Sequence, residues 1–148
     1  MSGGPGRGCY RGAMDVESLE AALRSRAENV RGEDGAWDFE IAGVHMACFT
    51  DTRFDRMRLV APILDAGDMS DVQREAVLEA NFHTALDARY GTSDGVLYSA
   101  FIHPLSPLTA EQFASALEQV AGLVDTFGST YSSGALIFGV PRADRDLN

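Results

Sequence analysis

The three histidines are the side chains best suited to acid–base chemistry or metal binding in this sequence. They are His45, His83 and His103, and no two of them stand two to four residues apart, the spacing that neighbouring ligands of one zinc site usually have. Asp87 follows His83 by four residues, but the two side chains would share a face only if one helix continued through both. We therefore interpret the histidines as core or surface residues and predict neither a metal nor another cofactor.

Nucleophile and phosphate-binding motifs are missing as well. Cys48 lies in an apolar run without a neighbouring arginine that would lower its pKa, so we interpret it as a packed core thiol. Ser129 falls late in a helical pattern, whereas the serine of a nucleophile elbow follows a strand. The glycine-rich residues 3–8 lack the lysine of a phosphate loop, and the whole chain contains no lysine. The sequence predicts a protein that is not an enzyme.

Length and charge narrow the choice of partners. The 148 residues allow one domain, and 22 acidic against 12 basic residues give a net charge of −10. This charge repels nucleic acids and acidic membrane surfaces, so we expect neither as a partner. No apolar run has the length of a secretion signal or a membrane span, and the two cysteines, Cys9 and Cys48, do not suggest a disulfide framework. We therefore expect a cytoplasmic protein.

The chain divides into three parts. Residues 1–13 are rich in glycine without an apolar period, so we expect a flexible leader that contributes nothing to the fold. The domain is expected over residues 14–131, and residues 132–148 form a C-terminal tail. The tail contains an apolar run from Ala135 to Val140, which would add an edge strand or dock on a partner.

Apolar residues at spacings of three and four predict three helices. The first begins after Asp15 and runs to about Val30. The second begins at a capping box of Ser70 and Gln73 and ends near Asn81. The third begins at the capping box formed by Thr109 and Gln112. Its apolar stripe consists of Phe113, Leu117, Val120, Val124, Phe127 and Tyr131.

Alternating patterns predict the strands. Three of them, residues 37–41, 44–49 and 56–63, follow one another with short links and indicate an antiparallel meander. A hairpin follows, with strands over 84–90 and 96–102 joined by a turn at 91–95; the alternative is that the second helix continues to Tyr90. The expected fold class is α+β, with an antiparallel sheet of about five strands and the order α-β-β-β-α-β-β-α.

The third predicted strand and its surroundings carry more apolar surface than one face of a small sheet can bury. We expect part of that surface to meet another chain, although plain core packing beneath the first and third helices is the alternative. The residues concerned are Phe49, Phe54, Met57, Leu59, Val60, Ile63 and Leu64.

The order of elements and three stretches of sequence resemble the type III secretion chaperone-like superfamily over residues 15–131. The stretches are Arg56-Met57-Arg58-Leu59-Val60-Ala61-Pro62, Leu78-Glu79-Ala80-Asn81-Phe82, and Gly95-Val96-Leu97-Tyr98 ahead of Pro104-Leu105-Ser106-Pro107-Leu108. The superfamily contains small, acidic, cytoplasmic homodimers that hold secreted effectors without ATPase activity. It also contains a branch of bacterial sensory-transduction regulators.

The resemblance implies a non-catalytic protein-binding domain that holds an extended segment of a client protein by strand addition and side-chain pockets. A regulatory, sensory-transduction adaptor on the same fold is the alternative. An acidic rim would favour clients with basic stretches around an apolar anchor. The client-binding residues implied are Leu19, Leu23, Phe49, Met57 and Val60. The homodimer interface implied consists of Val77, Leu78, Val96, Tyr98 and Phe101.

Overall fold

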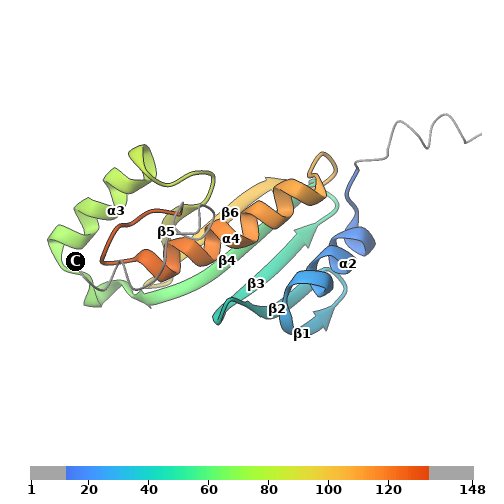
Figure 1. Cartoon of the computed structure of the whole chain (residues 1–148), viewed down its shortest axis with the longest axis horizontal. Helices are drawn as coiled ribbons and strands as arrows, with labels where there is room; N and C mark the ends of the chain where they lie inside the picture. The colour runs from blue at the N-terminus through green and yellow to red at the C-terminus, as the bar shows by residue number, and fades with distance from the viewer. Residues whose placement is uncertain (1–12, 134–148) are drawn as a thin grey trace, which may run out of the picture.

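The computed structural model describes residues 13–133, and within them three α-helices accompany one six-stranded sheet (Figure 1). The predicted leader, apart from Ala13, and the apolar run from Ala135 to Val140 lie outside the described residues. The helices are α2 (Val16–Arg26), α3 (Asp71–His83) and α4 (Ala110–Thr126), with a 3-10 turn η1 (Ala66–Asp68) ahead of α3. The strands are β1 (Glu28–Glu33), β2 (Ala36–Ile41), β3 (Val44–Asp51), β4 (Arg56–Asp65), β5 (Arg89–Ser93) and β6 (Val96–Pro104).

All strand pairs are antiparallel, and the strands lie in the order β1-β2-β3-β4-β6-β5. Three hairpins turn through two residues that both have positive φ, as a type I′ turn requires. These turns are Asp34-Gly35, Ala42-Gly43 and Asp94-Gly95. The α+β class and the antiparallel sheet are confirmed, and the sheet has six strands where about five were expected.

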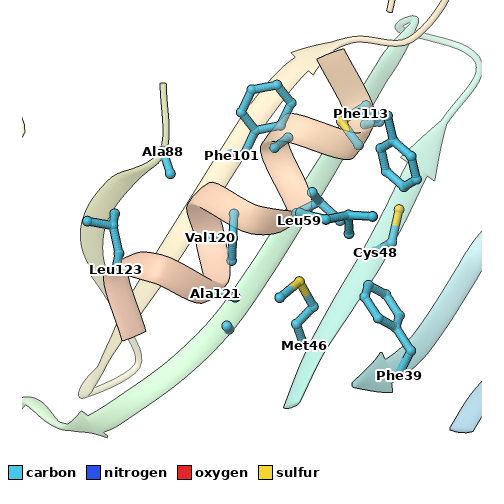
Figure 2. Close-up of a cluster of buried hydrophobic side chains, with 14 of the residues drawn as sticks. Phe39, Met46, Cys48, Leu59, Ala88, Phe101, Phe113, Val120, Ala121 and Leu123 are labelled. Atoms are coloured by element: carbon cyan, nitrogen blue, oxygen red, sulfur yellow. The ribbon is translucent and has the colours of Figure 1, made fainter. Parts of the chain in front are cut away.

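The core lies between one face of the sheet, which we call the inner face, and helices α2 and α4. Alternate residues of the strands point into it, including Phe39 of β2, Cys48 of β3 and Leu59 of β4, all buried. Helix α4 lies across this face and contributes Phe113, Val120 and other buried side chains (Figure 2). The predicted interpretation of Cys48 as a core thiol is therefore confirmed.

The predicted capping boxes begin the second and third helices. Ser70 accepts a hydrogen bond from the backbone N–H of Gln73, and Thr109 accepts one from that of Gln112. Helix α4 ends earlier than its apolar stripe suggested, at Thr126. The Thr126 hydroxyl lies 2.7 Å from the Ser132 carbonyl oxygen, so the chain after α4 folds back along the helix and does not extend it.

The first predicted helix was too long, because residues 28–33 form strand β1. Its apolar stripe had included Val30, but helix α2 ends at Arg26 and the following residues pair with β2, Arg31 opposite Asp38. Asn29, with a φ of 56°, and a register shift between Glu28 and Arg31 make the new strand irregular. Pairing with β2 thus determines the structure of residues 28–33, whose own sequence pattern is weak.

The predicted hairpin is confirmed as the β5–β6 pair, but its first strand was placed too early at 84–90, and the helical alternative was wrong. Helix α3 ends at His83, and β5 begins only at Arg89. Between them the backbone donors are taken by side chains of another part of the chain: the Leu86 N–H donates to the Ser133 hydroxyl at 2.8 Å. The N–H groups of Asp87 and Ala88 donate to the Gln119 side-chain oxygen at 2.6 and 3.0 Å.

Candidate functional site

The face of the sheet opposite the core, which we call the outer face, carries exposed apolar side chains. Phe49, Arg58 and Ile102 are direct cross-strand neighbours on β3, β4 and β6. Phe49 is 47 % exposed and Ile102 is 57 % exposed. Helices α2 and α4 pack on the inner side, and α3 lies beside β5, so no helix of the described residues covers this row (Figure 1).

Small residues make a hollow beside that row. Ala47, Val60 and Ala100 are cross-strand neighbours, and their short side chains leave a depression of about 540 Å³ between Phe49 and Ile102 at one end and Tyr98 at the other. We call this depression the outer hollow. A second depression of about 390 Å³ shares Phe49, Arg58 and Ile102 with it and extends toward Met57. Together they form one elongated surface across three strands, which is apolar around Phe49, Val60 and Ile102 and polar where Thr50, Asp51 and Arg56 line the second depression.

Helix α3 carries a second exposed apolar surface. Leu78 and Phe82 stand four residues apart, so their side chains are neighbours on one helix face, and they are 68 % and 83 % exposed. Val72 in the first turn is exposed as well. The opposite face of the helix holds Val77 and Ala80, both buried. We call Val72, Leu78 and Phe82 the α3 surface.

The two edges of the sheet are poor templates for an added strand. Asn81 of α3 brackets the backbone of Tyr90 on β5: its side-chain oxygen accepts from the Tyr90 N–H at 2.8 Å, and its amide donates to the Tyr90 carbonyl at 3.0 Å. On the other edge β1 is irregular at Asn29 and also carries Gly32 with a φ of 120°. Both features obstruct pairing with a further strand.

The residues implied by the resemblance do not all reach a surface. Of the client-binding set, Leu19, Leu23 and Met57 are buried in the core, whereas Phe49 and Val60 lie on the outer face. Of the dimer set, Val77 and Phe101 are buried, Leu78 is exposed on α3, and Val96 and Tyr98 are half-buried.

Sequence reasoning missed Ile102, Phe82 and Arg58 as surface residues of these two regions. The alternation of strand β6 places Phe101 inward and therefore Ile102 outward. Because residues 96–102 are nearly all apolar, the sequence does not show which alternate set faces the core. The exposure of Phe82 follows from the helical period once Val77 and Ala80 are known to be buried.

The described residues contain no group of three or more histidine, cysteine, aspartate or glutamate side chains arranged for a metal ion. Cys48 follows His45 by three residues, a spacing that the sequence interpretation passed over, yet alternation along β3 places the exposed His45 and the buried Cys48 on opposite faces of the sheet. Burial raises the pKa of the Cys48 thiol to about 12, which leaves it protonated and unreactive. No helix of the described part is long and apolar enough to cross a membrane.

Comparison with known proteins supports the architecture. No family model matches the sequence, and no curated protein matches it. Among solved structures, the chain is similar to one of the ExsC-ExsE complex, with a TM-score of 0.51 and 16 % identity over 63 % of this chain and 73 % of that one. A structure of the HopA1-SchA chaperone-effector complex is also similar, with a TM-score of 0.46 and 16 % identity over 72 % of this chain and 84 % of that one. The described chain therefore shares its α+β fold with the matched chain of the ExsC-ExsE complex.

Proposed function

We propose that this protein is a non-catalytic, homodimeric protein-binding domain whose outer face holds an extended segment of a client polypeptide. The observation that carries the proposal is the elongated apolar surface around Phe49, Val60 and Ile102, which no helix of the described residues covers. Apolar patches of this kind, rimmed by polar residues, mark interaction sites in proteins. The likeness to the ExsC-ExsE complex supports the fold on which the proposal is built.

Binding across the outer face replaces the strand addition that the resemblance implied. The bracket from Asn81 to Tyr90 already occupies the outward-facing backbone groups at that position of β5. The outer face offers side-chain contacts instead, and two adjoining depressions of about 540 and 390 Å³ suit several consecutive residues of an extended chain. Client affinity then depends on apolar side chains and less on backbone pairing.

The α3 surface is the proposed homodimer contact. Leu78 and Phe82 lie on α3, at the far end of the molecule from α2 (Figure 1), and neither side chain lines the outer hollow. A symmetric dimer would pair α3 with its copy and would remove both apolar side chains from water. Because the α3 surface and the outer hollow share no residue, dimerisation leaves the client surface open.

Client binding is tested with matched aspartate substitutions of two exposed phenylalanines. Phe49 lines both depressions, whereas Phe54, which is 69 % exposed, lies in the turn between β3 and β4 and lines neither. We expect Phe49→Asp to abolish capture of the client from a lysate of the source cells and Phe54→Asp to retain it. Equal capture by the two variants, at unchanged helix content in circular dichroism, would contradict the proposal.

Dimerisation is tested by light scattering coupled to size exclusion. The wild-type protein should show twice the chain mass of 15.9 kDa at tens of micromolar. Leu78→Asp and Phe82→Asp should shift it to a single chain mass because each places a charge in the apolar contact. Phe54→Asp again serves as the control and should remain dimeric. A wild-type monomer at this concentration would refute the dimer.

A further inference from the structure

The outer hollow has a charge opposite to that of the whole protein. The chain carries a net charge of −10, yet the residues that line the hollow include Arg58 and His45 and no aspartate or glutamate. A cationic side chain in an apolar depression favours an anionic partner there. The lining of the hollow therefore differs in charge from the acidic rim that composition suggested around it.

Arg58 is placed to meet such a partner. Its cross-strand neighbours are Phe49 and Ile102, the two exposed apolar side chains at the end of the hollow. Within residues 13–133 Arg58 makes no ion pair and no side-chain hydrogen bond, whereas the nearby Asp51 pairs with Arg53 at 3.6 Å. The guanidinium is thus left with its five N–H donors for a ligand.

Two carboxylates of the outer face lie on β2, to one side of the hollow. Asp38 and Glu40 alternate with the buried Trp37 and Phe39 on β2, so they face outward, and they oppose Ala47 and His45 across the β2–β3 pair. Asp51, at the end of β3, lines the second depression and pairs with Arg53 at 3.6 Å, whereas Arg58 on β4 lines both depressions.

We propose that the outer hollow selects extended polypeptide segments in which a carboxylate stands between apolar side chains, with the carboxylate bound by Arg58 and the apolar side chains beside Phe49 and Ile102. The inference rests on the proposed function, since it names the kind of segment that the outer face holds. A carboxylate accepts two parallel hydrogen bonds from a guanidinium, and neighbouring apolar contacts exclude water from them.

The shape of the surface favours a polypeptide over a small carboxylic acid. The second depression continues past Phe49 and Ile102, so the hollowed surface extends on both sides of Arg58; its further lining residues are Thr50, Asp51, Arg56 and Met57. A fatty acid has its carboxylate at one end and would fill only one side. A chain with its acid in the middle fills both sides.

The test uses three fluorescent twelve-residue peptides of alternating threonine and valine that differ at one central position. The central tripeptide is Val-Glu-Val, Val-Gln-Val or Val-Lys-Val, and binding to the full-length protein is followed by anisotropy. We expect the glutamate peptide to bind about three- to tenfold more tightly than the glutamine peptide and the lysine peptide to bind most weakly. The preference for glutamate should shrink as salt is added, because the pair is partly exposed.

Substitutions at Arg58 test whether its guanidinium causes the preference for the glutamate peptide. Arg58→Gln should bind the glutamate and glutamine peptides equally, and Arg58→Glu should prefer the lysine peptide. Arg31→Gln is the control: it changes the net charge by the same amount from β1, outside the hollow, and should keep the wild-type preference. Circular dichroism should be unchanged in all three variants, since both arginines are exposed.

Equal binding of the three peptides to the wild-type protein would overturn the charge selection and leave the proposed apolar client surface standing. Failure of all three to bind would overturn the selection as well. If, in addition, Phe49→Asp captured as much client as Phe54→Asp, the proposed function would be contradicted together with the charge selection. Displacement of the glutamate peptide by decanoate at equal concentration would identify a site for small carboxylic acids and would likewise overturn the inference.

Discussion

The inner and outer faces of the sheet are made by neighbouring residues of the same strands, yet they differ in what covers them. On β4, Leu59 is fully buried beneath α4, while the next residue, Val60, lines the outer hollow. On β3, Cys48 is buried and Phe49 is 47 % exposed. Stability therefore resides on one face, and the other is free to carry apolar residues for a partner. Each pair of neighbours offers a controlled comparison between the two roles.

The largest difference is expected in thiol reactivity. With Cys9→Ser in place, Cys48 is the only thiol, and its pKa of about 12 leaves about one molecule in 10⁴ ionised at pH 8. A thiol moved one residue along the strand, in Phe49→Cys with Cys48→Ser and Cys9→Ser, should have an ordinary pKa. We expect it to react with Ellman's reagent at least about a thousandfold faster in the folded protein. Comparable rates would show that the inner face opens readily to solvent.

Truncation of Leu59 and of Val60 compares how much each face of the sheet contributes to the free energy of unfolding. Leu59→Ala should lower the free energy of unfolding by about 3 kcal/mol, because it leaves a cavity beneath α4. Val60→Ala should cost less than about 1 kcal/mol, since that side chain has no helix above it. Urea denaturation measures both. Similar costs would mean that the outer face is covered as well, for example by a second copy of the chain.

A smaller effect on stability is expected from the close contact between α4 and the chain that follows it. A Cβ atom at Gly122 of α4 would lie 2.9 Å from the Ser133 carbonyl oxygen, too close for an unstrained contact. Gly122→Ala should therefore destabilise the protein by about 1–2 kcal/mol, although alanine is the better helix former. Gly67→Ala is the matched control, because nothing lies within 4 Å of the added atom and its stability should change little. Thermal unfolding of both variants tests the contact.

The smallest predicted effect concerns the sheet edge, where the two faces meet. Asn81→Ala removes both hydrogen bonds to the Tyr90 backbone and should cost about 1 kcal/mol. It should also free those backbone groups of β5 for pairing with another chain, which light scattering would detect as association at high concentration. Glu79→Ala, an exposed change on the same helix, should do neither. If Asn81→Ala matched this control, the edge would be protected by some other means.

Much of the fold could be predicted from local patterns. The capping boxes at Ser70 and Thr109 fix where α3 and α4 begin, because they satisfy backbone donors within a single turn. The alternation of Trp37 and Phe39 with acidic residues predicts both a strand and its buried face. In each case the residues that decide the structure are close together in the sequence.

The predictions were wrong where residues that are distant in the sequence determine the local structure. The loop before β5 is held by Gln119 and Ser133, which lie more than thirty residues away, so its own alternation was misleading. To locate the candidate site, one must know which residues of β6 face outward. A nearly continuous apolar strand does not reveal which of its two sides faces the core. The resemblance had assigned Leu19, Leu23 and Met57 to a client, although all three are buried in the core. Their apolar pattern could not correct this, because it shows that a side chain leaves water but not what replaces the water.

The connections of the sheet also set an order for its assembly. Four of the five strand pairs join consecutive strands, and three of these hairpins have two-residue turns, so their ends meet at little entropic cost. The β4–β6 pair is different, because η1, α3 and β5 intervene. We expect it to form last, and pulsed hydrogen exchange should then show late protection of the β6 amides that bond to β4. Until β6 arrives, β4 is an open edge that carries Met57, Leu59 and Ala61, so the nascent chain is most prone to aggregate during that interval.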